Sequence, residues 1–146
     1  MQSTEQVYAA TFAMLTQLAN ANPGLFKTVS RRLVLVEEVD PSQMPGVYQH
    51  QLTAFSKENT LAGLDIFAYT MDWYVYNYTP DMTTPTTPGL NALVDALLSV
   101  FPREGTSIRI QVNGITVDVS LNGPVEYFEG LLDTKSVARI HLQVLA

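Results

Sequence analysis

Cysteine is absent from this chain, and both histidine and basic residues are scarce. Without cysteine there can be no disulfide framework and no thiolate metal site. The histidines, His50 and His141, lie on separate predicted strands, and no serine nucleophile motif surrounds either of them. Because catalysis usually needs titratable or nucleophilic groups held beside one another, we expect no enzymatic activity and no cofactor.

Lysine and arginine are also few compared with aspartate and glutamate. Eight lysine and arginine residues stand against fourteen aspartate and glutamate residues, which gives a net charge of −6, and residues 58–102 contain no basic residue. Nucleic-acid ligands are therefore not expected, because phosphate neutralisation needs clustered basic side chains. The chain has no apolar run of transmembrane length and no basic-then-apolar signal segment, so no membrane partner is expected either.

The acidic residues do not show the spacing of a metal site. Glu37, Glu38 and Asp40 are close in sequence, but neighbouring side chains of a strand point to opposite faces, and the spacing of a calcium loop is missing. Phosphate-binding glycine motifs and zinc-type spacings of histidine and cysteine are missing too. We therefore expect no bound metal.

The hydrophobic pattern predicts two amphipathic helices within a single domain that covers residues 1–146. The first helix begins with a capping box, in which Ser3 is the N-cap and Gln6 lies three residues further on. The second begins at Thr87-Pro88, with Thr87 as its N-cap, and Pro102 closes it. Each helix has one apolar face, which is typical of helices that pack on one side of a sheet.

Strands are predicted over residues 28–39, 47–55, 60–79, 108–112, 115–121 and 136–146, and residues 125–132 are ambiguous. Asn113-Gly114 lies between two alternating segments and is the strongest hairpin signal, because a type I′ turn needs positive φ at both central residues. The register of such a hairpin places Arg109 opposite Asp118. The expected fold class is α+β, with the two helices packed on one face of a mainly antiparallel mixed sheet.

Aromatic residues are concentrated in the strand predicted over residues 60–79. Trp73 falls on the face expected to join the core, whereas Tyr74, Tyr76 and Tyr78 share the other face. Three interpretations stay open for this second face: packing within the domain, a protein interface, or stacking on nucleic-acid bases. The last requires interleaved basic residues, which this segment does not have. Tyrosine is enriched at protein interfaces.

A stiff polar loop follows this strand. Residues 79–88 hold three prolines and five threonines, and Met82 at the centre has no local apolar partner. We expect the tyrosine face and this loop to contact neighbouring subunits or another assembly component, with Met82, Thr83 and Thr84 in the contact. Arg31 and Arg32 are further candidates for the same interface; as neighbours on a strand, they point to opposite faces.

Two segments, Leu25–Leu33 and Leu90–Leu97, resemble a family of small prophage proteins that are encoded among the tail genes of long-tailed phages. With the predicted order of helices and strands, they are similar to the tail terminator, or tail completion, proteins of lambda-like phages. Many members carry charged residues after the paired arginines, whereas this chain has Val34-Leu35-Val36.

The resemblance implies an α/β subunit that forms a homo-hexameric ring, caps the finished tail tube, stops its polymerisation and offers the surface to which the head attaches. The implied partners are other copies of the chain, the tail tube protein and a neck or head-closure protein. DNA would pass through the ring without sequence-specific binding. The implied location is the tail or neck of the virion, reached through the host cytoplasm during assembly. Alternatives are a neck or head-closure connector component, a tail tube subunit, and, less favoured, a small ligand-binding domain or enzyme.

Overall fold

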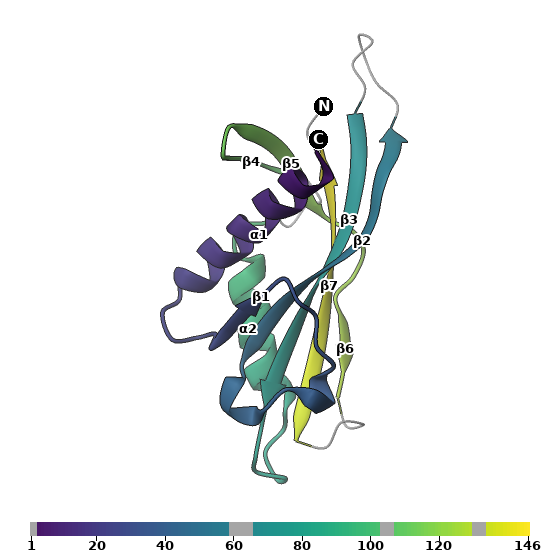
Figure 1. Ribbon diagram of the computed structural model, residues 1–146. Helices are drawn as coiled ribbons and strands as arrows, with labels where there is room; N and C mark the ends of the chain where they lie inside the picture. The colour runs from purple at the N-terminus through teal and green to yellow at the C-terminus, as the bar shows by residue number, and fades with distance from the viewer. Residues whose placement is uncertain (1–2, 59–65, 103–106, 130–133) are drawn as a thin grey trace.

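A computed structural model of the chain describes residues 3–58, 66–102, 107–129 and 134–146. Within these ranges the chain forms two α-helices, two short 3₁₀ helices and one seven-stranded sheet (Figure 1). The helical elements are α1 (Thr4–Asn20), η1 (Val36–Glu38), η2 (Pro41–Gln43) and α2 (Thr87–Leu98). The strands are β1 (Thr28–Ser30), β2 (Gly46–Glu58), β3 (Ile66–Tyr78), β4 (Ile108–Val112), β5 (Ile115–Leu121), β6 (Glu126–Phe128) and β7 (Lys135–Leu145).

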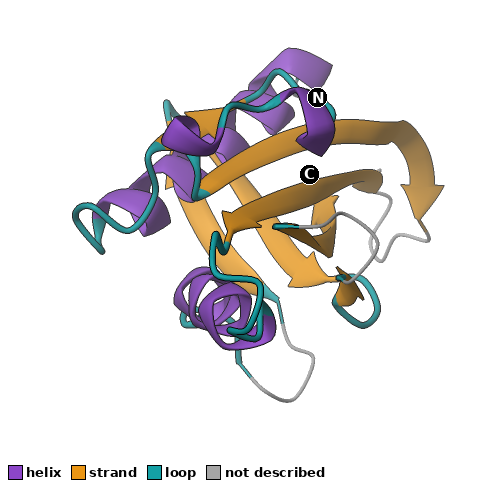
Figure 2. Ribbon diagram, turned by 90° about the horizontal axis from the view of Figure 1, so that it is seen from below, coloured by secondary structure: helices purple, strands orange, loops and turns teal. Residues whose placement is uncertain are grey.

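The sheet has the order β1-β2-β3-β7-β5-β4, with β6 also paired to β7. Every pair of strands is antiparallel except β1 and β2, which are parallel. The sheet is curled, as the view from below shows (Figure 2). Both helices contribute to a single core against one face of the sheet, which confirms the predicted α+β class and helix placement.

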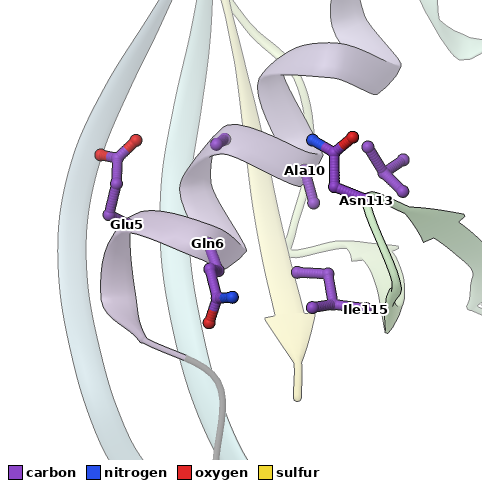
Figure 3. A pocket seen from close by; sticks show the side chains of 7 residues that line it. Glu5, Gln6, Ala10, Asn113 and Ile115 are labelled. Carbon is purple, nitrogen blue, oxygen red and sulfur yellow. The ribbon is translucent and has the colours of Figure 1, made fainter.

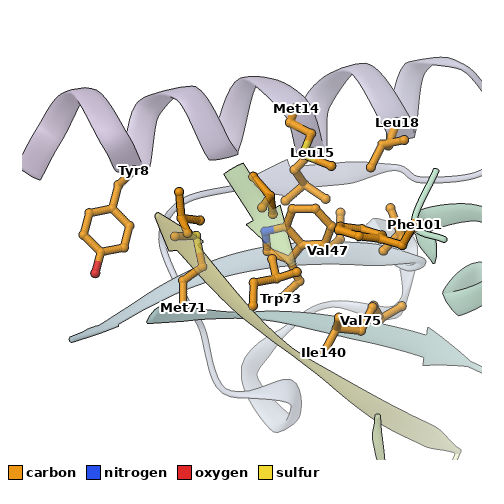
Figure 4. Packing of buried hydrophobic residues seen from close by; sticks show 14 of the residues in the cluster. Tyr8, Met14, Leu15, Leu18, Val47, Met71, Trp73, Val75, Phe101 and Ile140 are labelled. Atoms are coloured by element: carbon orange, nitrogen blue, oxygen red, sulfur yellow. The ribbon is translucent and has the colours of Figure 1, made fainter. Parts of the chain in front are cut away.

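The first helix begins as its capping box predicts. Ser3 Oγ accepts a hydrogen bond from the backbone N–H of Gln6 at 3.1 Å, and the Ser3 N–H donates to Gln6 Oε1 at 2.8 Å. The apolar stripe of α1 then packs against the sheet, where Leu15 lies in the same core as Trp73 and Ile140 (Figure 4). One-sided burial of this kind supplies most of the stability of a surface helix.

A buried polar network connects α1 to the central strands. Trp73 Nε1 donates to Gln49 Oε1 at 3.1 Å, and Gln49 Nε2 donates to the Tyr8 carbonyl at 2.9 Å. The Tyr8 hydroxyl lies 2.6 Å from the Thr53 carbonyl and 3.1 Å from the Thr70 carbonyl, where the pairing of β2 and β3 changes register. Burial raises the pKa of Tyr8 to about 12, so this hydroxyl keeps its proton and donates to the irregular part of the ladder.

The hairpin of β4 and β5 has the predicted register. Val112 pairs with Ile115 across the turn, and Arg109 lies opposite Asp118, with Arg109 Nε 3.0 Å from Asp118 Oδ1. Asn113 and Gly114 take φ angles of 51° and 80°. These positive angles are those of a type I′ turn, which explains why this dipeptide predicts the hairpin correctly.

Strands β5 and β6 share one edge of β7. Asp118–Leu121 pair with Leu142–Leu145, and Glu126–Phe128 pair with Val137–Arg139. Between them the Asn122 N–H donates to the His141 carbonyl at 2.8 Å, and the chain turns at Gly123, whose φ is 95°. Part of the ambiguous segment 125–132 is therefore a strand, and residues 130–133 lie outside the described ranges.

The strand predicted over residues 28–39 is wrong beyond Ser30. After β1 the chain leaves the sheet and makes the two 3₁₀ helices. Val36 and Val39 are three residues apart, so in the tight η1 turn both side chains reach the same side and are buried. The apolar run thus belongs to a loop that covers the sheet, and its valines and leucines mimic the composition of a strand.

Other boundaries also differ from the predictions. Helix α2 has Thr86 rather than Thr87 as its N-cap, and it ends at Leu98 instead of continuing to Pro102. Phe101 is nevertheless buried, and its N–H donates to the Leu98 carbonyl at 3.0 Å. Strand β3 covers residues 66–78 of the strand predicted over 60–79, and residues 60–65 are outside the described ranges.

Candidate interaction surface

The face of the sheet opposite the helices carries the predicted tyrosines, and the loop of residues 33–44 covers part of it. Tyr76 is only 3% exposed, and its hydroxyl donates to the Val34 carbonyl at 2.6 Å. Its ring lies 4.9 Å from that of Tyr48, between ring centroids, in a second small core with Val36 and Val137. Tyr76 therefore stabilises the chain's own fold, which corrects its assignment to an exposed contact surface.

Lys135, at the start of β7, binds backbone carbonyls of this covering loop. Its Nζ donates to the carbonyls of Val36, Glu37 and Val39 at 3.1, 3.2 and 2.9 Å. These carbonyls belong to η1 and the residue after it: the Val36 carbonyl also accepts from the Val39 N–H at 3.3 Å, whereas those of Glu37 and Val39, at the end of the turn, have no partner within it. One ammonium group thus satisfies three backbone acceptors and holds η1 against the sheet.

Tyr74 and Tyr78 are half-buried at the margin of the covered area. Tyr74 lies between side chains of the two strands that flank β3. Its ring centroid is 6.0 Å from that of His50 on β2, and the guanidinium carbon of Arg139 on β7 is 6.0 Å from the Tyr74 centroid. This is the outer limit for a cation–π contact. Of the three tyrosines on this face, Tyr74 and Tyr78 therefore keep surface that a partner could cover.

Beyond the tyrosines, the same face holds four charged or titratable side chains in contact. Asp72, on the central strand β3, has a side chain only 1% exposed, and its Oδ1 lies 2.6 Å from His141 Nδ1. Arg139 Nε lies 3.1 Å from Asp72 Oδ2 and 3.7 Å from Glu126 Oε1. His141 Nε2 contacts Glu126 Oε1 in turn. A buried carboxylate needs such partners, because its desolvation is expensive without them.

His141 links two strands through both of its ring nitrogens. Hydrogen bonding to Glu126 and then to Asp72 raises the pKa of His141, although partial burial opposes this change. The hydrogen bond from His141 in turn lowers the pKa of Glu126. Because both nitrogens contact carboxylates, neither is free to take a proton from a substrate. The arrangement therefore connects β6 to β3 and β7.

The sequence analysis found no catalytic motif around His141 and did not predict this cluster. A signal was present in the pattern, because Asp72 is a charged residue in the middle of an aromatic strand. A charge at such a position predicts partners of opposite charge on the neighbouring strand. Arg139 and His141, two residues apart and on one face of the final strand, are such partners, but the pairing of β3 with β7 was not predicted.

The predicted loop residues are at the surface. Met82 is 72% exposed, and Thr83 and Thr84 are exposed beside it. Asp81 holds the loop in shape: its carboxylate accepts hydrogen bonds from the Thr83 N–H at 2.9 Å and from the Thr83 and Thr84 hydroxyls at 2.8 Å. These bonds lower the pKa of Asp81. The exposure of Met82 is as predicted, and its contact with a partner stays a prediction.

The predicted arginines lie at the end of β1, on one edge of the sheet. Arg31 makes a bidentate ion pair with Glu5 of α1, with distances of 2.6 and 3.0 Å. Arg32 is exposed. The opposite edge carries Tyr127 and Phe128 of β6, two neighbouring aromatic side chains that also remain exposed. The structure therefore separates the predicted residues among the second face, the loop before α2 and one edge of the sheet.

A hollow of about 140 Å³ lies between the start of α1 and the β4–β5 hairpin (Figure 3). Glu5 is the one titratable residue in its lining, and Arg31 pairs with it; the others are Gln6, Ala9, Ala10, Val112, Asn113 and Ile115. Among the described residues, no group of three or more histidine and acidic side chains is arranged to hold a metal ion. In those same ranges, no helix is both long and apolar enough to cross a membrane.

Comparisons with known proteins support the fold and identify no family. No protein-family model matches the sequence, and no curated protein matches it. One solved structure, whose name states no function, has a similar fold. The alignment covers 99% of this chain and 95% of the other chain, with 16% sequence identity and a TM-score of 0.56. At that identity the likeness shows a shared fold alone.

Proposed function

We propose that this chain is a structural subunit of a phage tail, which assembles with its own copies into a ring that caps the tail tube. Such a ring ends tube polymerisation and provides the attachment surface for the head or neck. The observation that carries the proposal is the exposure of large apolar side chains in separate places: Leu35 after β1, Met82 before α2, and Tyr127 and Phe128 on β6.

Apolar side chains on different surfaces of one chain favour head-to-tail association. When two distinct patches bind each other, the contact repeats until it closes into a ring or continues as a filament. Charged residues make up only 15% of the chain, so much of its surface is suited to being covered. The resemblance of Leu25–Leu33 and Leu90–Leu97 to tail terminator proteins supports the phage-tail role in particular.

The acidic composition fits the passage of DNA through such a ring. Each subunit would bring a net charge of −6, and acidic side chains at the lumen would repel the phosphate backbone. The genome could then slide through without adhering. A lumen lined mainly by lysine and arginine would contradict this part of the proposal.

The test combines the assembly state with tube growth. The purified chain is examined by sedimentation and by electron microscopy, and is then added to tail tube protein during polymerisation. Rings that bind one end of each tube and stop its growth are the expected result. A chain that stays monomeric at all concentrations, or rings that leave tube length unchanged, would overturn the proposal. A chain that itself polymerises into tubes would identify a tube subunit instead.

A further inference from the structure

The pairing of the strands aligns β1 and β6 at the same level on opposite edges of the sheet. Each residue of β1 belongs to a row that crosses β2, β3 and β7 and ends at a residue of β6. One row holds Thr28, Gly46, Tyr76, Val137 and Phe128, the next holds Val29, Val47, Val75, Ala138 and Tyr127, and the third holds Ser30, Tyr48, Tyr74, Arg139 and Glu126.

The directions of these edge strands are also compatible with each other. β1 is parallel to β2, and each following pair across to β6 is antiparallel, so β1 and β6 run in opposite directions. If one copy is placed beside another with the faces of the sheets aligned, β6 of the first lies antiparallel to β1 of the second. Exposed strand edges of this kind are templates for pairing with another chain.

The two edges carry opposite charge. Lys27, Arg31 and Arg32 flank β1, and both Lys27 and Arg32 are exposed. Glu126 and Glu129 flank the other edge and are exposed as well. The other cations whose side chains the structure describes are occupied elsewhere, since Arg109 pairs with Asp118, Lys135 binds backbone carbonyls and Arg139 contacts Asp72. Among the side chains that the structure describes, the cations still open to a partner are therefore Lys27 and Arg32 at the β1 edge, where Arg31 pairs with Glu5.

We propose that β6 of one copy pairs antiparallel with β1 of the next, in the register that the rows define. The proposal rests on the ring assembly proposed above and names its subunit interface. With Thr28 opposite Phe128, the same register places Lys27 opposite Glu129 and Ser30 opposite Glu126. Arg31, one residue further, points to the opposite face, where it pairs with Glu5 of its own chain. Opposite charges directly across an antiparallel pair stabilise it and define its register.

Apolar contacts on both faces accompany this pairing. Val29 shares the helix-covered face with Tyr127, and Thr28 shares the second face with Phe128, so each exposed aromatic ring gains a neighbour. Leu35, exposed after β1, lies in the chain segment that continues from this edge. Since each strand has only three residues, the charges provide the register and the aromatic rings provide much of the buried area.

The experiment is a charge-reversal cycle in the full chain, measured by sedimentation. Lys27→Glu and Glu129→Lys are made singly and together. Each single variant places like charges opposite each other, so we expect at least tenfold weaker association at each contact, and loss of the rings. The double variant restores opposite charges and should recover rings. Arg109→Glu makes the same change in net charge as Lys27→Glu but on the exposed β4–β5 hairpin, outside the proposed interface. It should assemble normally, although it places a second carboxylate opposite Asp118.

The folded state of each variant is checked by circular dichroism, because Glu129 also accepts hydrogen bonds from the hydroxyls of Thr86 and Thr87. If Glu129→Lys fails to fold, Lys27→Glu decides alone, since Lys27 is an exposed side chain. Rings that survive both single reversals would overturn this interface and leave the proposed function standing. Single losses without recovery in the double variant would overturn the register.

A different result would separate this interface from the proposed function. If assembly depends on these charges as expected, but the assemblies do not stop the growth of tail tubes, the interface stands and the tail-capping role fails. If the unaltered chain stays monomeric at all concentrations, both proposals are overturned.

Discussion

Replacement of Lys135 by methionine tests whether the covering loop is held mainly by one ammonium group. Methionine keeps an unbranched apolar stem of similar length but cannot donate to the carbonyls of Val36, Glu37 and Val39. The Glu37 and Val39 carbonyls would then lose this donor, and the Val36 carbonyl would keep only the Val39 N–H, while the packing of Val36 and Val39 on Tyr76 stays possible. The free energy of unfolding should therefore fall without a change of fold.

The magnitude follows from the two contacts that are partly buried, those to Val36 and Val39, because the contact to Glu37 is exposed and screened by water. A hydrogen bond that involves a charged group contributes about 1.5–3 kcal/mol. After allowance for the side-chain entropy that lysine loses when it is fixed, we expect a loss of roughly 2–4 kcal/mol. For a chain of this size, that corresponds to a fall in Tm of roughly 5–15 °C.

The assay is thermal unfolding in dilute solution, followed by circular dichroism, with acrylamide quenching of tyrosine fluorescence as a second measurement. Release of the loop exposes Tyr48 and Tyr76, so quenching should increase below the unfolding transition. Lys27→Met is the matched control, because that lysine is exposed. At a concentration at which both chains are monomeric, so that the interface proposed above does not contribute, its Tm should change by less than about 2 °C. An equally small change in Lys135→Met would show that water replaces the ammonium group without loss, and the reasoning would be wrong.

Two further predictions concern the cluster on the second face and the hairpin turn. The pKa of His141 is raised in the folded chain, so its contribution to stability is full below the pKa of an unfolded histidine, roughly 6.5, and is lost as pH rises through the higher folded value. The Tm difference between the unaltered chain and His141→Gln should therefore shrink as pH increases from 6 towards 9, and a difference independent of pH would refute the assignment. Gly114→Ala places a side chain at a φ of 80° and should lower the free energy of unfolding by about 1 kcal/mol in denaturant titrations, unless the turn changes type.

The sequence allows prediction of the elements that local chemistry determines. Ser3 and Gln6 predict the start of α1, and Asn113-Gly114 predicts the hairpin and its register, because in both cases the deciding contacts lie within a few residues. Alternation along residues 66–78 likewise predicts that the face of β3 with Trp73 joins the helix-covered core. These features need no knowledge of how distant segments pack.

Features that depend on distant contacts could not be predicted in the same way. The segment 33–39 has the composition of a strand, but its apolar side chains meet Tyr48 and Tyr76, and these neighbours become visible only once the sheet is assembled. The same holds for Asp72, whose partners on β7, Arg139 and His141, lie more than sixty residues away along the chain. Hydrophobic composition shows that a residue is buried, but tertiary packing decides whether a strand or a covering loop buries it.

The position of β7 has a consequence for how the chain folds during synthesis. This strand comes last among the elements along the sequence, yet it lies between β3 on one side and β5 and β6 on the other. At translation rates of about 5–20 residues per second, β3 waits on the order of several seconds for its partner to leave the ribosome. During that interval two apolar strand edges stay open at the centre of the future sheet, where an early contact with a second nascent chain would compete with the native pairing.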